Sequence, residues 1–563
     1  MIGDQRRESQ GVRSQNRDIA TAGPRAAGPT NRRAFLARAL LAPSAARFWQ
    51  DREKRSSLLT NAGVIDGSGR ARYRADVLIS GDRIEKIGKI GKASGAEVFD
   101  LEGLCLAPGF IDIHTHTDPQ LAVNPHAESK LRQGVTTELT GNCGSSAVPS
   151  RFRSTDTFET YFAELDELPL SINYATLVGH GTLRAFVVGE EDRAATAREL
   201  SDMKRWLHAF LTQGAFGFSS GLEYTPGSFA TLRELAALNS VTARHRALYA
   251  THMRNEGDRL LEAITEAIEV SRRSGARLQI SHLKTEGKDN WPKIGRALRL
   301  IESARAAGVD VHFDRYPYTA FSTGLETVFP LWIREGGDSA FVARLKDDDA
   351  VERARPEVES KVRSVNSWNA YFVAALSTAK NKWAEGKSLQ EVADTLKISP
   401  FEAARRLIIE EDDRVSIVAF AMNEDNLITF LKHPLAMVGS DGNALAAEGP
   451  LAQGRPHPRS YGTFPRVLGL YVREKKALSL EAAVRKMTSL PAEKIGLKQR
   501  GMIRPGYFAD LVAFDPDKIA DTATFENPHR YAAGIDYVFV NGICALRKSE
   551  INPQKSGRVL RRT

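Results

Sequence analysis

The sequence predicts an α/β protein, a (β/α)8 barrel with a small β-sandwich domain formed by both termini. Two observations support this fold class. Between residues 108 and 498, short apolar strands alternate with amphipathic helices, and about eight such units fit this length. Repeated βα units imply a parallel sheet, and eight of them close into a barrel. Residues 56–107 and 499–555 instead hold short β runs separated by turn signals.

The elements of the barrel follow from local patterns. Apolar strand-like runs are expected at 110–113, 175–180, 215–220, 248–252, 278–282, 309–314 and 436–441. Amphipathic helices are expected at 230–247, 257–275 and 290–307, where apolar residues recur at helical spacing. A charged, helical run at about 325–420 interrupts the alternation, and we expect an insertion near the barrel mouth. In the last β-rich part, Asn541-Gly542 is a hairpin signal.

Composition limits the class of partner. The chain has 563 residues and a net charge of +9, with 12 Lys/Arg against 5 Asp/Glu in residues 1–55. The rest of the chain is therefore nearly neutral, which argues against a nucleic-acid partner. No apolar run approaches the roughly 20 residues of a membrane span. The patterns do not indicate an oligomeric state.

Residues 1–55 are predicted to be a disordered leader outside the fold. Arg32-Arg33, followed by Phe35-Leu36 and a weakly apolar segment, resembles a twin-arginine export signal. A short amphipathic leader helix is the alternative. The export signal would place the protein in the periplasm, and without it the protein would be cytoplasmic.

Polar residues end one apolar run after another, and this pattern predicts a metal site. His114 and His116 are two positions apart, so their imidazoles project in the same direction from one strand end. The other candidates at strand ends are Cys143, His180, His252, His282 and Asp441. In a barrel these ends converge on one face, and a thiolate with imidazoles suits zinc. A single histidine at a strand end is more often structural, but several with a cysteine and an aspartate are not explained that way.

Seven motifs in order carry a resemblance: PGFIDIHTH, GNCG, THMRNEG, ISHLK, YPYTAFST, GSDG and RPHPRSYGTFPRVLG. Together they resemble the D-aminoacylase (N-acyl-D-amino-acid deacylase) family of the amidohydrolase superfamily, over roughly residues 58–550. The resemblance implies a metal-dependent hydrolase barrel with a β-sandwich from both termini. This agrees with the fold read independently from the strand and helix patterns.

The resemblance also assigns roles to the strand-end residues. It implies that Cys143, His252 and His282 hold a tightly bound Zn²⁺. His114, His116 and Asp441 would line a second, weaker metal position, with Cys143 between the two in place of the carboxylated lysine of many amidohydrolases. Zinc would polarise the scissile carbonyl and acidify its bound water. Asp441 would take the proton from that water and pass it to the leaving amine.

Further motif positions imply substrate contacts. Arg459 in RPHPR matches the carboxylate-binding arginine of the family, and a guanidinium fork suits a carboxylate. Tyr224, Tyr316 and Ser322 match other substrate-contacting positions, although both tyrosines are also compatible with packed rim aromatics.

Three more polar residues have less definite readings. His180 follows the family pattern and is expected to be structural or to support the site from behind. Lys284 is expected to be a polar rim residue. Glu223 could reach the metals or be a solvated loop acid, and the loop acid is favoured. The loop 443–451, between Asp441 and Arg459, is longer than expected and leaves the side-chain specificity open.

The predicted function is zinc-dependent hydrolysis of the amide bond of N-acyl-D-amino acids, which are small-molecule substrates. One alternative is a cyclic-amide hydrolase, such as a hydantoinase or dihydropyrimidinase, on the same barrel. Cys143 in place of a bridging lysine, and Arg459 for a free carboxylate, argue against it. The other alternative is a non-catalytic binding protein on a decayed barrel, against which the intact set of metal ligands argues.

Overall fold

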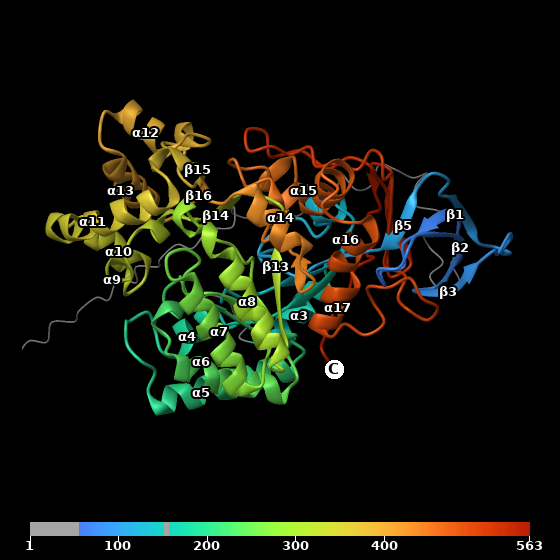
Figure 1. Cartoon of the computed structure of the whole chain (residues 1–563), viewed down its shortest axis with the longest axis horizontal. Coiled ribbons are helices and arrows are strands. Elements are labelled where there is room, and N and C mark those ends of the chain that lie inside the picture. The colour runs from blue at the N-terminus through green and yellow to red at the C-terminus, as the bar shows by residue number, and fades with distance from the viewer. Residues whose placement is uncertain (1–55, 151–156) are drawn as a thin grey trace, which may run out of the picture. The chain divides into compact units, whose positions relative to one another are not determined.

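Eight parallel strands close into the barrel that carries the site (Figure 1). The computed structural model describes residues 56–150 and 157–563, so the Arg32-Arg33 pair lies outside the described residues. The strands in order are β6 (Phe110–Asp112), β7 (Val135–Thr140), β8 (Asn173–Thr176) with its continuation β9 (Val178–Gly179), β10 (Gly217–Gly221), β11 (Leu248–His252), β12 (Arg277–Ile280), β13 (Val311–Arg315) and β17 (Ala436–Val438). Each pairs in parallel with the next, and a bridge between Thr115 and Gly442 connects the first strand to the last.

Amphipathic helices follow the barrel strands, and the first five of them pack on each other in sequence order. They are α4 (His180–Val187), α5 (Ala197–Thr212), α6 (Leu232–Arg244), α7 (Leu260–Ser274), α8 (Ile294–Ala306), α14 (Glu424–Lys432) and α16 (Leu480–Met487). Local signals define their ends: Thr196 and Glu199 form a capping box before α5, and Gly275 ends α7 in the left-handed conformation. Three helices expected from the sequence, at 230–247, 257–275 and 290–307, are present as α6, α7 and α8.

Shorter elements complete the barrel domain. They are α2 (Glu128–Leu131), α3 (Phe158–Asp166), α15 (Arg459–Arg466), the π-helical turn η8 (Val467–Glu474) and α17 (Ser489–Ile495). Because α15 starts at Arg459, the first turn of this helix fixes the position of that side chain.

An insertion separates β13 from α14 and has its own hydrophobic core. Its elements are β14 (Ala320–Gly324), α9 (Leu331–Arg334), α10 (Asp338–Arg344), α11 (Asp348–Val365), β15 (Tyr371–Leu376), α12 (Leu389–Leu396), α13 (Pro400–Glu411) and β16 (Val415–Phe420). The strands form an antiparallel sheet in the order β14-β16-β15. The sequence pattern indicated only helices here, because the abundant charged residues obscure three short strands.

Both ends of the described chain build one nine-stranded sheet. Its strands are β1 (Ser56–Val64), β2 (Tyr73–Ser80), β3 (Arg83–Gly88), β4 (Glu97–Asp100), β5 (Cys105–Pro108), β18 (Leu511–Phe514), β19 (Ile535–Val540), β20 (Ile543–Arg547) and β21 (Glu550–Ile551). β5 pairs antiparallel with β18, with Pro108 opposite Leu511. A bridge between Arg83 and Phe508 brings β3 back to the segment before β18, so the sheet curves over its own core. The predicted fold class is confirmed, whereas the predicted domain boundaries remain predictions.

The Asn541-Gly542 hairpin is present between β19 and β20. Both residues have positive φ, 49° and 78°, as a type I′ turn requires. Within the described residues no helix is both long and apolar enough to cross a membrane. Cys105, Cys143 and Cys544 are all free thiols.

The final residues return to the barrel, which no sequence pattern indicated. Val559 forms a bridge with Tyr174, and the amide of Leu560 donates to the Tyr174 carbonyl at 2.7 Å. The amide of Arg562 donates to the Gly214 carbonyl at 2.9 Å. Tyr174 lies in the first half of β8 and Gly214 precedes β10, so this tail covers the end of the barrel opposite the site.

Candidate metal centre

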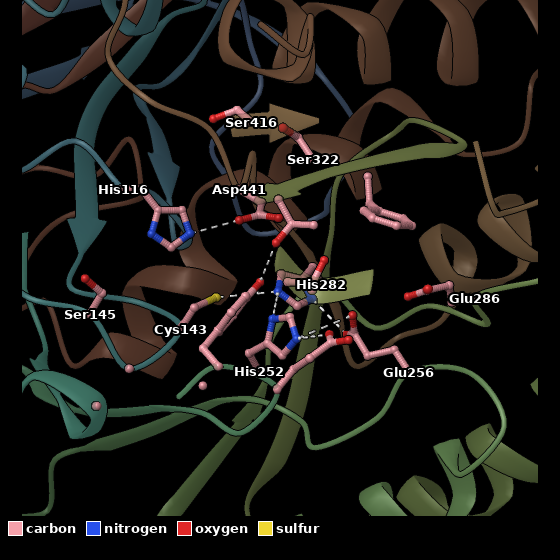
Figure 2. Close-up of a pocket in the computed structure, with 18 of the residues that line it drawn as sticks. His116, Cys143, Ser145, His252, Glu256, His282, Glu286, Ser322, Ser416 and Asp441 are labelled. Atoms are coloured by element: carbon pink, nitrogen blue, oxygen red, sulfur yellow. Dashed lines mark hydrogen bonds and ion pairs between the residues drawn. The ribbon is translucent and has the colours of Figure 1, made fainter. Parts of the chain in front are cut away.

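The predicted ligand residues converge at the carboxyl ends of the barrel strands, and all of them except the buried His114 line one cavity (Figure 2). His114 and His116 follow β6, Cys143 follows β7, His252 ends β11, His282 follows β12 and Asp441 follows β17. They come together because parallel strands of a barrel end on the same face. The cavity has a volume of about 540 Å³.

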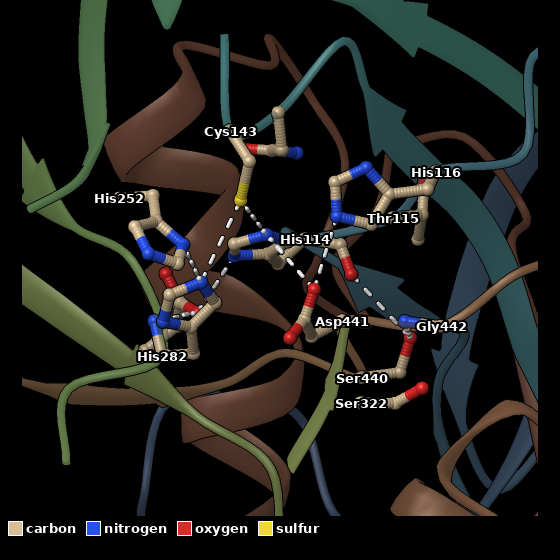
Figure 3. Close-up of polar contacts among 12 residues, drawn as sticks. His114, Thr115, His116, Cys143, His252, His282, Ser322, Ser440, Asp441 and Gly442 are labelled. Atoms are coloured by element: carbon tan, nitrogen blue, oxygen red, sulfur yellow. Dashed lines mark hydrogen bonds and ion pairs between the residues drawn. The ribbon is translucent and has the colours of Figure 1, made fainter. Parts of the chain in front are cut away.

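One group of four side chains can hold a metal ion. One ligand atom from each of His114, Cys143, His282 and Asp441 lies within 4.8 Å of those from the others. The thiol Sγ of Cys143 is 3.3 Å from His114 Nε2 and 3.5 Å from His282 Nε2 (Figure 3). A sulfur, two imidazoles and a carboxylate are donors that zinc accepts.

A second group shares His282. It consists of His252, Glu256 and His282, and His252 Nδ1 lies 3.0 Å from His282 Nε2. The two imidazoles therefore bring Nδ1 of one ring and Nε2 of the other together beside Cys143. With the Cys143 sulfur, these two nitrogens could provide three protein ligands, the number that catalytic zinc sites use.

Carboxylates behind the imidazoles fix the orientation of the rings. Three contacts share this arrangement: His252 Nε2 to Glu223 at 3.1 Å, His282 Nδ1 to Glu256 at 3.0 Å and His114 Nδ1 to Asp314 at 3.1 Å. Each carboxylate accepts a hydrogen bond from the outer ring nitrogen, so the inner nitrogen faces the centre and would present its lone pair to a bound metal ion. Such outer partners make an imidazole a better ligand.

The sequence-based predictions were least accurate for these carboxylates and their partners. The expectation that Glu223 is a solvated loop acid is wrong, because its carboxylate binds His252 and also Lys361 of the insertion at 2.6 Å. Lys284 is not a rim residue: it is 3% exposed and forms an ion pair with Glu256. Asp314 near the end of β13 carried the same strand-end signal as His252, whereas Glu256 in a loop carried none.

Three of the site residues have left-handed backbone conformations, with φ of 50° at Cys143, 33° at His282 and 52° at Asp441. Such conformations are strained for residues other than glycine and concentrate at functional sites. At Gly221 an added Cβ would lie 2.0 Å from the Cys143 carbonyl oxygen, so only glycine allows β10 to approach the cysteine. The backbone is therefore shaped to aim these side chains inward.

The surroundings favour the thiolate form of Cys143. Burial alone would raise the pKa of this thiol. The positive charge of His114 and hydrogen bonds from neighbouring histidines outweigh burial and hold the pKa well below its ordinary value. Since the thiolate is the form that binds metal, the site is prepared for a cation.

Asp441 is held between histidines and an arginine. Its Oδ1 lies 3.0 Å from His116 Nε2 and 3.4 Å from His114 Nε2. Its Oδ2 lies 2.7 Å from Nη1 of Arg459, an ion pair without hydrogen-bond geometry. Burial would raise the pKa of this carboxyl, but the charges of Arg459 and of the histidines hold it well below its usual range.

The four predicted substrate-contacting residues line the same cavity. Arg459 donates from Nη2 to the Ser322 carbonyl at 3.2 Å and lies 5.0 Å from the centre of the Tyr316 ring. The buried Tyr316 hydroxyl has no hydrogen-bond partner among the described residues. The Tyr224 ring centre is 4.8 Å from that of His252.

His180 lies outside this arrangement. It begins α4 instead of ending a strand, and its Nε2 pairs with the buried Glu234 at 2.9 Å. The structural reading of His180 therefore holds, and the pattern of residues at strand ends included one that does not line the cavity.

Comparison with known proteins agrees with this geometry. The model of the amidohydrolase family matches residues 97–545. The chain belongs to the D-aminoacylase family of amidohydrolases. Like other amidohydrolases it is an enzyme that hydrolyses amide bonds, on a barrel that its strand order and its ligand set both indicate.

Individual amidohydrolases resemble it over nearly their whole length. The N-acyl-D-glutamate deacylase of Alcaligenes xylosoxydans xylosoxydans is 38% identical over 91% of this chain and 97% of that protein. The D-aminoacylase of the same organism is 36% identical over 90% of this chain and 97% of that protein. The crystal structure of N-acyl-D-glutamate deacylase from Bordetella bronchiseptica, complexed with zinc and a phosphonate inhibitor, is 35% identical. The structural alignment covers 90% of this chain and 100% of the deacylase chain, with a TM-score of 0.77.

Proposed function

We propose that this amidohydrolase cleaves the amide bond of N-acyl-D-amino acids and releases a carboxylate and a free D-amino acid. The position of Arg459 carries the proposal. Arg459 is 7% exposed and lies beside the metal-binding side chains. Its guanidinium carbon is 5.0 Å from the centre of the Tyr316 ring, whose hydroxyl has no partner among the described residues. A buried cation and a free donor at this point suit the α-carboxylate of an amino acid. The names of relatives at 36–38% identity support the same substrate class.

The donor atoms support zinc as the metal. Cys143, His252 and His282 would hold the tight zinc, and His114, His116 and Asp441 would line the second, weaker position. When bound, zinc supplies Lewis-acid chemistry that polarises a carbonyl and lowers the pKa of a water. Glu223, Glu256 and Asp314 keep the imidazoles in the protonation state and orientation that this binding needs.

Asp441 is the group that moves the proton. Its lowered pKa keeps it ionised at neutral pH, so its carboxylate can accept a proton from the attacking water. As the carbon–nitrogen bond breaks, the same carboxyl gives that proton to the leaving nitrogen. Arg459, Tyr316 and Tyr224 hold the substrate so that the amide lies within reach of Asp441.

The two alternatives fit this site less well. A cyclic amide such as a hydantoin has no free α-carboxylate, so Arg459 would remain without a ligand. A non-catalytic binding protein would not need the carboxylates that orient the histidines.

A paired panel of N-acetyl-D- and N-acetyl-L-amino acids, assayed for free amine, tests the proposal. We expect the D-isomers to be hydrolysed by the zinc-loaded enzyme and activity to disappear after treatment with a chelator. Hydrolysis restricted to L-isomers, or to cyclic amides, would overturn it.

Export is a separate proposal that rests on the sequence of residues 1–55. We expect removal of these residues to leave an active enzyme, and the double change of Arg32→Lys with Arg33→Lys to retain the protein inside the native host. Cell fractionation tests this, and unchanged export of the double variant would contradict it.

A further inference from the structure

The cavity has two chemically different ends. Ser145 and Glu286 lie on opposite sides of the donor side chains in Figure 2. Near Ser145 the wall includes small uncharged residues: the Thr182 hydroxyl accepts from the Ser146 amide at 3.0 Å, and an added Cβ at Gly181 would lie 3.0 Å from the Gly144 carbonyl oxygen. Near Glu286 it holds ionisable groups. A substrate bound across the centre would therefore place different groups in the two ends.

At this end of the cavity, the Glu286 carboxylate has no hydrogen-bond or ion-pair partner among the described residues. Glu286 lies in the loop after β12 and is half-buried. Within residues 56–150 and 157–563, its side chain makes no hydrogen bond and no ion pair. It nevertheless faces a cavity, where a free carboxylate is costly unless a cation arrives.

The neighbouring charges are already paired. Glu223 binds Lys361 at 2.6 Å, and Glu256 forms an ion pair with Lys284. Glu223 also contacts His252 at 3.1 Å and Glu256 contacts His282 at 3.0 Å, so each of these two carboxylates has a lysine and a histidine as partners, whereas Glu286 has neither within the described part of the chain. Burial first, and then the negative charge of Glu223, raises the pKa of Glu286 to about 7.

A second polar group at this end has no partner. Tyr371, at the start of β15 in the insertion, lines the cavity and is 1% exposed. Its hydroxyl makes no hydrogen bond to any described residue. A buried hydroxyl and a half-buried carboxylate that both lack partners indicate that a ligand completes this part of the cavity.

We propose that Glu286, with Tyr371, forms the side-chain subsite and selects a basic side chain, so that the substrates are N-acyl derivatives of cationic D-amino acids such as D-lysine and D-arginine. The inference rests on the proposed deacylase function. An ammonium or guanidinium group would pair with the Glu286 carboxylate, which has no partner among the described residues. An acidic side chain would be repelled by the Glu286 carboxylate. To pair with Lys361, it would have to break the ion pair between Lys361 and Glu223.

The acyl group takes the other end of the cavity. Simple acyl groups are uncharged, which matches the small residues beside Ser145 and not the acids around Glu286. The two ends therefore separate the two halves of the substrate by chemistry, with the α-carboxylate on Arg459 between them.

The test compares N-acetyl-D-lysine with N-acetyl-D-norleucine, which has nearly the same shape and no charge. A hydrogen-bonded charge pair corresponds to a preference on the order of 10–100-fold, so we expect kcat/KM to favour D-lysine by that factor. Glu286→Gln should bring the ratio close to one. Glu262→Gln, an exposed glutamate on α7, is the matched control and should keep the ratio of the unchanged enzyme.

Two further measurements keep the test decisive if Glu286→Gln folds poorly. Free D-lysine should inhibit the unchanged enzyme more strongly than free D-norleucine. Glu286→Lys should reverse the preference toward N-acetyl-D-glutamate.

A preference of the unchanged enzyme for D-norleucine or D-glutamate, or an unaltered ratio in Glu286→Gln, would overturn the inference while leaving the deacylase function intact. A change in acyl-group preference in Glu286→Gln would also overturn it, whereas hydrolysis of no N-acetyl-D-amino acid would contradict the proposed function itself.

Discussion

Nη1 of Arg459 lies 2.7 Å from Oδ2 of Asp441, so the proposed substrate anchor pairs with the proposed proton carrier. The two roles are coupled by this contact. A substrate carboxylate that engages the guanidinium competes with Asp441 for the same positive charge. Binding of the substrate would therefore make Asp441 a stronger base at the moment when a base is needed.

Arg459→Ala tests this coupling. We expect KM for an N-acetyl-D-amino acid to rise on the order of 10–100-fold, because a charge-assisted contact to the carboxylate is lost. The charge of Arg459 also lowers the pKa of Asp441, so the acidic limb of the pH profile of kcat/KM should move to higher pH. Arg459→Lys should show a smaller change in both KM and the acidic limb of the pH profile. An unchanged KM in Arg459→Ala would show that the carboxylate is held elsewhere.

Asp441→Asn separates proton transfer from metal binding. General acid–base catalysis contributes roughly 10²–10⁴-fold, and we expect kcat to fall by that factor. Zinc held by Cys143, His252 and His282 should remain, as measured by metal analysis of the purified variant. Loss of this zinc in Asp441→Asn would instead make the aspartate part of the tight site.

Cys143→Ala should remove most of the tight zinc. The Cys143 sulfur lies 3.3 Å from His114 Nε2 and 3.5 Å from His282 Nε2. The other two cysteines of the chain, Cys105 and Cys544, lie in the nine-stranded sheet, so neither thiol can replace it. Cys544→Ala, in the nine-stranded sheet, is the matched control and should retain about one zinc per chain. Full zinc content and activity in Cys143→Ala would exclude the cysteine from the centre.

Glu256→Gln should weaken zinc binding without unfolding the protein. Removal of the carboxylate behind a metal-binding imidazole typically costs roughly 10–100-fold in metal affinity. Glu234→Gln is a close control, because Glu234 is also a buried glutamate that pairs with a histidine, but outside the centre. Competition with a chromogenic chelator measures both, and equal affinity in the two variants would contradict an orienting role for Glu256.

Selectivity for a basic side chain should depend on pH. Below pH 7 the carboxyl of Glu286, whose pKa is raised to about 7, is protonated and neutral, and above pH 7 it is ionised. The carboxylates of Glu223 and Glu256 and the ammonium groups of Lys361 and Lys284 face it and keep their charges over this range. The ratio of kcat/KM for N-acetyl-D-lysine over N-acetyl-D-norleucine should therefore rise between pH 6 and 8. A flat ratio would contradict the participation of Glu286.

The barrel and its centre could be predicted because their signal is local. An apolar run that leads to a polar residue such as His252 or Asp441 predicts both a strand and the end of the barrel at which that side chain lies. The nine-stranded sheet was partly predictable for the same reason, since turn signals such as Asn541-Gly542 delimit its strands. What remained hidden depends on contacts between distant segments.

The partners of the ligands illustrate this. Glu223 looks like any loop acid until Lys361, from a helix 138 residues later, and His252 are placed beside it. Glu256 and Lys284 form their ion pair only once folding has brought the two loops that carry them together. The insertion contributes Tyr371 to the cavity from a strand that its charged sequence does not reveal.

The pairing of β5 with β18 has a consequence for how the protein is made. Pro108 and Leu511 lie opposite each other. The edge of β5 that pairs with β18 therefore has no partner strand until some four hundred further residues have been synthesised, whereas its other edge pairs with β1. At about 5–20 residues per second, that interval lasts roughly 20–80 s. During this time the buried residues of β5 are exposed on the ribosome-bound chain. A chaperone or the adjacent strands must protect this edge until β18 emerges, which makes slower translation a hazard for this fold.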